Sequence, residues 1–189
     1  MKRIFALALT FSLVLLLSGC NLKEDPLEKF IKKMETEQNF EMEATMDVPL
    51  FGKLKIVIQQ DGNKSYTSAS LFSDESFTEE VEGIVYEYSK NSQGEWVKSV
   101  QETEDVDSDL PAVEELKYED FTKGEDGKYT LNQEKASSYE VDSLIIELTE
   151  DGAIMTMEVS ESGFVMSVII TISKIGEVTI TLPEIGSTD

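Results

Sequence analysis

Residues 40–48 of this 189-residue chain read FEMEATMDV. Every second position from Phe40 to Val48 is apolar, and polar residues fill the positions between them. An alternation with a period of two predicts a strand with one face buried and the other in water. We therefore expect residues 39–48 to form a half-buried β-strand, which sets the pattern for the rest of the chain.

Short apolar runs of the same kind recur along the chain, on both sides of an acidic stretch at residues 101–109. Turn sequences such as Asp61-Gly62-Asn63 and Glu150-Asp151-Gly152 separate neighbouring runs, which is typical of an antiparallel meander. We expect further strands at residues 53–60, 65–72, 76–81, 84–89, 96–100, 129–131, 143–149, 153–160, 163–173 and 177–182.

An amphipathic helix is expected over residues 26–38, directly before the first strand. Asp25 can cap its start and Pro26 suits its first turn. One apolar stripe follows at the spacing i, i+3, i+4 and i+7, formed by Leu27, Phe30, Ile31 and Met34. Two other segments have two interpretations each: residues 111–121 as a short helix or an irregular crossover, and residues 132–140 as a turn of helix or a loop.

Many strands and few helices predict an α+β fold built on one large, curved antiparallel sheet, a half-barrel. The N-terminal helix and one or two short helices would cover its concave face. A helix is about 10 Å across, which is narrower than a sheet of this size. Either the sheet curls until its apolar face closes, or an apolar hollow remains between sheet and helices.

Two interpretations of the inward-facing residues therefore stay open: a plastic packed core, or the lining of a ligand cavity. Methionine favours neither, because its unbranched thioether adapts both to irregular gaps and to variable apolar ligands. The candidate cavity residues are Phe30, Met34, Met42, Met46, Ile56, Ile58, Ile146, Met155, Met157, Met166 and Val168.

The first twenty residues have the layout of an export signal. Lys2 and Arg3 precede an apolar stretch at residues 4–17, which is shorter than the roughly 20 residues that span a bilayer. The stretch ends in Leu17-Ser18-Gly19-Cys20, which resembles the lipobox of bacterial lipoproteins, and Cys20 is the one cysteine of the chain.

That resemblance implies removal of residues 1–19 and attachment of a diacylglycerol group, with further acylation such as palmitate, at Cys20. Two acyl chains give stable membrane anchoring, which one chain does not. Residues 20–24 would then form a lipidated tether and residues 25–189 a single domain. The expected location is the extracytoplasmic face of the cell membrane.

The charge of the chain narrows its function further. It has 38 acids against 16 bases, a formal net charge of −22. Removal of residues 1–19 takes away two bases, and 14 − 38 gives −24. Such a charge opposes nucleic acid binding. The chain has no histidine, which removes the commonest general base. We expect no enzymatic activity and no cofactor.

Two local patterns have a possible binding role and a simpler structural interpretation. Asp105, Asp107 and Asp109 have the spacing that opens a calcium loop, yet Leu110 replaces the glycine at the sixth position. We expect a solvated acidic loop there and no metal site. The aromatic residues Tyr86, Tyr88 and Trp96 fit either the packing of a hairpin or the mouth of a ligand site.

The order of these elements resembles the LolA-like fold, including the lipid-binding lipoproteins of the LppX/LprG type. The resemblance rests on the helix after the lipobox, the strand at 39–48 with its hairpin, and the Tyr86/Tyr88…Trp96 hairpin. It also rests on Phe121…Tyr129-Thr130-Leu131 and on the ending Ile180-Thr181-Leu182-Pro183. It implies an apolar cavity between sheet and helices, in a lipoprotein of Gram-positive type.

Taken together, the sequence predicts a monomeric, non-catalytic lipoprotein that is anchored to the membrane through Cys20. It would bind an apolar or amphiphilic ligand, such as a lipid, between sheet and helices. The alternative is a cell-surface protein-interaction module with a fully packed core, no small-molecule ligand and another envelope protein as its partner.

Overall fold

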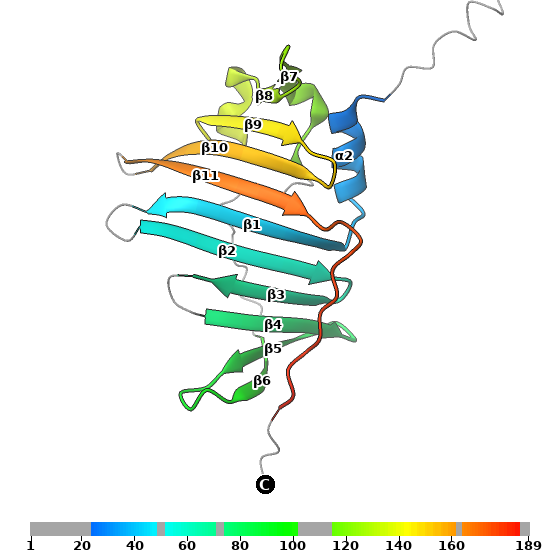
Figure 1. Ribbon diagram of the computed structural model, residues 1–189, viewed down its shortest axis with the longest axis vertical. Coiled ribbons are helices and arrows are strands. Elements are labelled where there is room, and N and C mark those ends of the chain that lie inside the picture. Colours follow the sequence, from blue (N-terminus) through cyan, green and yellow to red (C-terminus); the bar gives the residue numbers. More distant parts are fainter. Residues whose placement is uncertain (1–23, 49–51, 71–73, 102–114, 162–163, 186–189) are drawn as a thin grey trace, which may run out of the picture.

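The computed structural model describes residues 24–48, 52–70, 74–101, 115–161 and 164–185. These residues form one antiparallel sheet of eleven strands, helix α2 (Pro26–Met34) and two short 3₁₀ helices, η2 (Tyr118–Asp120) and η3 (Gln133–Ser138) (Figure 1). The large antiparallel sheet and the N-terminal helix are thus confirmed. The protein is mostly β, however, so the expected α+β class is only partly matched.

The sheet consists of two meanders that meet in its middle. Strands β1 to β6 run outward to one edge and β7 to β11 run inward from the other, and β1 pairs with β11. The sheet is open, with β6 and β7 at its edges. The strands are β1 (Asn39–Val48), β2 (Gly52–Asp61), β3 (Lys64–Ala69), β4 (Asp74–Val81), β5 (Ile84–Lys90), β6 (Trp96–Val100), β7 (Phe121–Lys123), β8 (Tyr129–Leu131), β9 (Ser143–Leu148), β10 (Ala153–Glu161) and β11 (Phe164–Ser173).

The expected strand at residues 177–182 was wrong. This segment has no strand structure, although Val178 and Ile180 are buried at alternate positions. Its backbone bonds to side chains instead of to a neighbouring strand, because Asn39 and Asp61 accept from the N–H groups of Val178 and Ile180. In Figure 1 this segment crosses the sheet from β11 toward β5.

Helix α2 ends at Met34, four residues earlier than expected. The carboxylate of Glu37 accepts hydrogen bonds from the backbone N–H groups of Gln38, at 3.1 Å, and Asn39, at 3.0 Å. These bonds satisfy the backbone outside the helix, and the chain turns directly into β1. Of the two segments with two interpretations, the first contains η2 at Tyr118–Asp120, directly before β7, and its residues 111–114 lie outside the described residues. The second contains η3 at Gln133–Ser138, which is a short helix.

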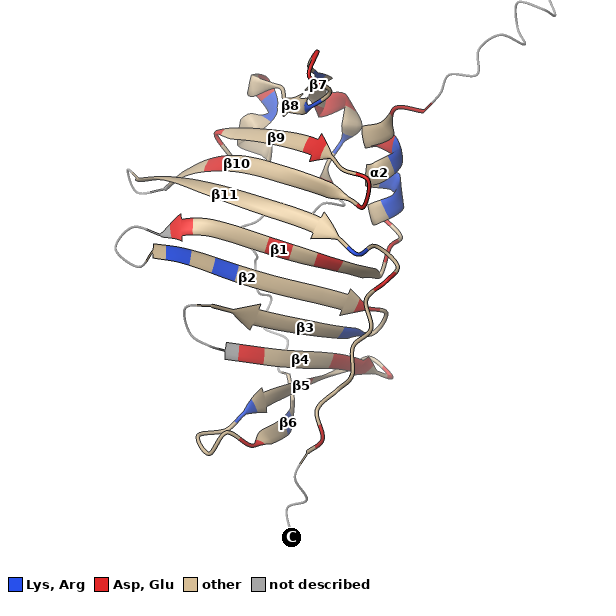
Figure 2. Ribbon diagram, in the orientation of Figure 1, with Lys and Arg blue, Asp and Glu red and all other residues tan. Residues whose placement is uncertain are grey.

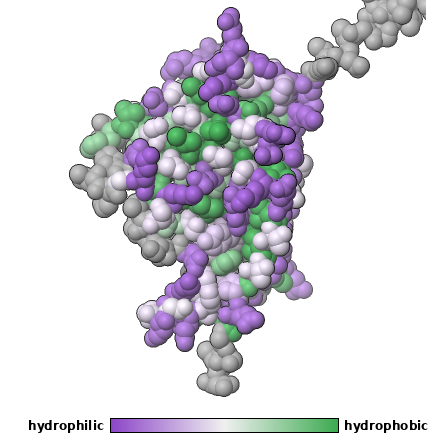
Figure 3. Space-filling view, viewed as in Figure 1, coloured by the Kyte–Doolittle hydropathy of each residue, from purple (hydrophilic) through white to green (hydrophobic). Residues whose placement is uncertain are grey.

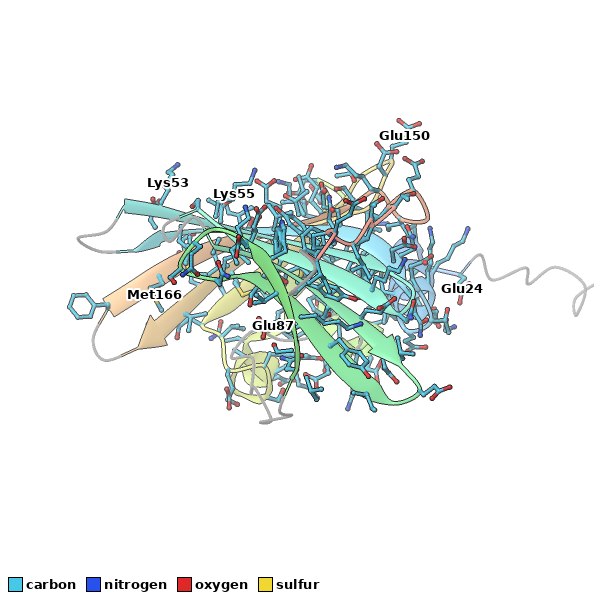
Figure 4. The ribbon with its side chains drawn as sticks, turned by 90° about the horizontal axis from the view of Figure 1, so that it is seen from below. Glu24, Lys53, Lys55, Glu87, Glu150 and Met166 are labelled. Atoms are coloured by element: carbon cyan, nitrogen blue, oxygen red, sulfur yellow. The ribbon has the colours of Figure 1, made fainter. Side chains whose placement is uncertain are left out.

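The strand register divides the sheet into two faces. Ala44 of β1 lies opposite Ile56 of β2 and Ile170 of β11, and the side chains of this row and its equivalents form what we call the inner face. The outer face carries the alternate residues, beginning with Glu41 and Glu43. The sheet is twisted, so that its strands cross at an angle when seen along its length (Figure 4).

The core lies between the inner face and the helices, over strands β1 and β8–β11. The apolar stripe of α2 packs there with residues of the sheet and of η3. The largest side chains with less than 2 % exposure are Leu27, Tyr129, Leu144, Ile146, Met155, Met157, Ile170 and Ile172. In the described parts of the chain, no helix combines the length and hydrophobicity needed to cross a membrane.

A buried polar network fixes the two 3₁₀ helices to each other. Asp120, which is 4 % exposed, accepts a hydrogen bond from the Tyr139 hydroxyl at 2.8 Å and pairs with Lys135 at 3.2 Å. The bond from Tyr139 lowers the pKa of the Asp120 carboxyl below its usual value, and Lys135 acts in the same direction. Burial, with the neighbouring carboxylate, raises the pKa of Tyr139 to about 12, so its hydroxyl keeps the proton that it donates.

Candidate functional site

A groove of about 680 Å³ lies at the end of the sheet, where α2 approaches the β9–β10 turn and the chain that leaves β11. This volume is within the usual range of small-molecule sites. The residues that line it come from three segments and are Pro26, Lys29, Phe30, Lys33, Leu148, Thr149, Glu150, Asp151, Gly152, Ser173, Lys174, Ile175 and Glu177.

Helix α2 forms the first wall of the groove, and Asp25 fixes its position. The Asp25 carboxylate accepts from the backbone N–H of Leu27 at 2.9 Å, which caps the helix. The same carboxylate accepts from the hydroxyl of Tyr129 at 2.7 Å. Because Tyr129 of β8 is only 1 % exposed, this bond ties the start of α2 to the sheet.

The β9–β10 turn forms the second wall, and Gly152 sets its distance from β11. A Cβ atom on Gly152 would lie 2.0 Å from the carbonyl oxygen of Ile172, which no side chain can tolerate. Glycine therefore lets this turn pack directly on the backbone of β11. The backbone N–H of Thr149 closes the turn by donating to the carbonyl of Gly152 at 3.0 Å.

The chain that leaves β11 forms the third wall. Gly176, with a φ of +84°, donates its backbone N–H to the carbonyl of Asn39 at 2.8 Å. Lys174 donates to the Glu41 carboxylate at 2.7 Å. Burial raises the pKa of the Glu41 carboxyl, but the hydrogen bonds from Lys174 and Gln59 outweigh that effect, so its pKa lies below the usual value.

The groove combines an apolar floor with charged walls. Phe30, Leu148 and Ile175 are buried or half-buried and belong to the edge of the core. Exposed lysines, Lys29 and Lys33, line the α2 side, and exposed acids, Glu150 and Asp151, line the turn. Figure 2 shows the lysine bands of α2 beside the acidic turn. Such a lining suits a molecule with an apolar part and a polar part.

Figure 4 places one acid of the groove, Glu150, relative to the faces of the sheet. Glu150 projects on the side of the outer face, together with Lys53 and Lys55, whereas Glu24 lies with α2 at the N-terminal end. The acidic turn of the groove thus projects toward the outer face.

Most of the predicted cavity residues lie away from this groove. Of the eleven, Phe30 lines it. Five others have at most 5 % exposure within the core, namely Met34, Ile146, Met155, Met157 and Val168. The remaining five are half-buried on the inner face, namely Met42, Met46, Ile56, Ile58 and Met166.

The aromatic hairpin of β5 and β6 is held by a contact with β4 and by its own contacts. The rings of Phe77 and Trp96 meet edge to face with centroids 5.3 Å apart. The Lys98 nitrogen lies 4.0 Å from the ring centre of Tyr86 and 5.0 Å from that of Tyr88, which is 5 % exposed. These contacts favour hairpin packing over a ligand mouth.

Two predicted sites lie outside the described residues. They are the lipid attachment site at Cys20 and the acidic loop with Asp105, Asp107 and Asp109. Within the described ranges, no three or more acidic or cysteine side chains are grouped closely enough to hold a metal ion.

Comparison with models of known protein families finds no match to this chain, and comparison with curated protein sequences finds none either.

Sequence reasoning did not identify the charged walls of the groove. Lys29 and Lys33 have the i, i+4 spacing of one helix face, which is also the pattern of an ordinary solvated face. Glu150, Asp151 and Gly152 read as a turn, which they are. No pattern in the sequence relates this turn to α2, because 117 residues separate Lys33 from Glu150.

Proposed function

We propose that this chain is a lipoprotein, anchored through Cys20 to the extracytoplasmic face of the cell membrane, that binds an amphiphilic molecule without transforming it. In this proposal the open sheet is the half-barrel of a LolA-like fold. The observation that carries it is the groove beside α2, with an apolar floor and charged walls.

The position of the groove supports the proposed anchor. Pro26 lines the groove and is the sixth residue after Cys20. Six extended residues span at most about 20 Å. A lipidated Cys20 would hold the groove close to the bilayer, where amphiphilic molecules are concentrated.

The packing of the core argues against a ligand site on the inner face over β9 and β10, and the proposal places the site at the end of the sheet. Side chains of the inner face such as Leu144, Ile146 and Met157 have no exposed surface. A ligand among them would have to displace well-packed residues, which costs several kcal/mol for each large side chain. The groove needs no such displacement.

Native mass spectrometry of the mature chain, residues 20–189 with Cys20→Ser, tests the proposal with dodecyl maltoside as the probe. We expect a one-to-one complex with the parent protein and none with Thr149→Trp. Thr149 is an exposed residue of the groove wall, and a tryptophan ring at this position would occupy the groove. Thr130→Trp, at an exposed position on β8, is the matched control. Equal binding by both variants, or none by the parent protein, would contradict the proposal.

The anchor has its own test. Expression of the full chain in a Gram-positive host with labelled palmitate should label the protein, and Cys20→Ser should prevent both labelling and membrane retention. Unlabelled protein released into the medium by the parent chain would contradict the anchor.

A second candidate function is docking of an envelope protein, and exposed apolar residues favour it. Phe164 and Val165 at the start of β11 are 61 % and 66 % exposed, and Ile169 and Ile145 on the outer face are 44 % and 38 % exposed. Figure 3 shows apolar side chains on this face over the upper strands. A photo-crosslinker at position 164 should capture one defined protein on the cell surface if this function holds, and none if it does not.

A further inference from the structure

The charges of the groove are arranged by sign. Lys29 and Lys33 stand on the α2 wall, one helical turn apart. Glu150 and Asp151 stand on the β9–β10 turn, and Glu177 follows β11. Lys29 and Lys33 therefore come from a different segment of the chain than these three acids, and the two groups meet only in the folded protein.

These groups do not neutralise each other across the groove. In the described residues, no carboxylate lies within the 4.0 Å salt-bridge distance of Lys29 or Lys33. Lys174, the third base of the lining, is held by Glu41 at 2.7 Å. Two lysines on one wall and three carboxylates in the opposing segments thus remain available to a bound molecule.

A ligand with a single charge would meet attraction from one wall and repulsion from the other. A ligand that carries both signs gains from both walls, provided that each charge faces the opposite one. Its apolar chain would lie on the floor formed by Phe30, Leu148 and Ile175. The charge pattern therefore selects among amphiphiles by their headgroups.

We infer that the groove binds a zwitterionic amphiphile, with its anionic group toward Lys29 and Lys33 and its cationic group toward Glu150 and Asp151. This inference rests on the proposed function, since it specifies the headgroup of the same ligand. The chemistry is that of a zwitterionic headgroup on an apolar chain, whether the molecule comes from the bilayer or is free in solution.

Four probes with the same dodecyl chain, each below its micelle concentration, test the inference on the Cys20→Ser mature chain. They are dodecylphosphocholine, dodecyl phosphate, dodecyltrimethylammonium and dodecyl maltoside. Solvent-exposed ion pairs are weak, so two of them predict a preference for the zwitterion on the order of fivefold to tenfold over the non-ionic probe.

Charge variants make the test specific. Lys29→Gln with Lys33→Gln should remove the preference for the zwitterion and improve binding of the cationic probe. Glu150→Gln with Asp151→Asn should also remove it, but improve binding of the anionic probe. Lys53→Gln with Glu158→Gln changes two exposed charges outside the groove and should alter none of the four affinities.

The outcomes separate the inference from the proposed function. Equal binding of all four probes, or tightest binding of dodecyl phosphate, overturns the inference and leaves amphiphile binding standing. Failure of every probe to bind overturns both. Vesicles of zwitterionic phospholipid identify the source: co-sedimentation that depends on Lys29 and Lys33 indicates a bilayer lipid, and binding of the monomeric probe alone indicates a free amphiphile.

Discussion

The side chain of Asn39 forms hydrogen bonds with both the N–H and the carbonyl of Val178, which lies 139 residues further along the chain. The Asn39 amide nitrogen donates to the Val178 carbonyl at 2.8 Å, and the amide oxygen accepts from the Val178 N–H at 2.8 Å. One side chain thereby replaces the pairing that a neighbouring strand would provide. It fixes the chain that leaves β11, and with it the third wall of the groove.

Asn39→Ala should destabilise the protein by about 2–3 kcal/mol, because it breaks these two hydrogen bonds and the one to Asp61, in a partly buried place. Urea denaturation followed by circular dichroism measures the change. Asn63→Ala, which removes one exposed bond to the Glu80 carbonyl, should cost less than about 1 kcal/mol. Equal losses of stability in the two variants would contradict a larger stabilising role for the Asn39 hydrogen bonds.

Gly152→Ala should cost about 3 kcal/mol or more, since the new Cβ would collide with the Ile172 carbonyl and force the β9–β10 turn away from β11. Gly83→Ala is the informative control, because Gly83 has a φ of +80° and open space around it. Its cost is limited to the backbone conformation, about 1–2 kcal/mol. Thermal denaturation of both variants should rank them in this order, and the reverse order would contradict the close approach.

Tyr139→Phe should destabilise the protein by about 1–3 kcal/mol at pH 7, because Asp120 loses a buried hydrogen bond. The pKa of Asp120 is lowered by folding, so its stabilising contribution is present above the ordinary aspartate pKa of about 4. It is lost as the pH falls through the lowered value. The difference between parent and variant should therefore shrink below about pH 4.

The control for this pH dependence is Tyr118→Phe, because Tyr118 is exposed and belongs to the same 3₁₀ helix as Asp120. We expect no change in its stability relative to the parent between pH 3 and pH 7. A difference for Tyr139→Phe that stays constant over this range would contradict the role of the ionised carboxylate.

Met157→Ala should cost about 2–5 kcal/mol, because Met157 has no exposed surface and its removal leaves a cavity in the core. Met166→Ala, at a half-buried position of the same inner face, should cost about 1 kcal/mol or less. Chemical denaturation compares the two. If Met157 lined an open cavity instead of a packed core, both substitutions would lower the free energy of unfolding only slightly.

The sequence allowed the sheet and the helix to be predicted because their side-chain patterns report burial directly. The alternation from Phe40 to Val48 marks β1, and the stripe from Leu27 to Met34 marks α2. The same pattern misled at residues 177–182. Val178 and Ile180 alternate because the segment lies flat on the sheet, and side chains, not a strand, satisfy its backbone.

The site was harder to predict because periodicity identifies an inward-facing residue but not what surrounds it. Met155 and Met46 have the same pattern in sequence, yet the first is 1 % exposed and the second is half-buried. Whether a face is hollow depends on how the helices pack on it. The groove depends on contacts between α2 and two distant turns, which no local pattern encodes.

The most direct test of the account is an NMR titration of the ¹⁵N-labelled Cys20→Ser mature chain with dodecylphosphocholine below its micelle concentration. We predict saturable shifts at the amides of α2, of residues 148–152 and of residues 173–177, which line the groove. Amides of the inner-face positions Met155 and Met157 should move little. Shifts centred on the inner face, or no saturable shifts at all, would contradict the claim that the groove is the binding site.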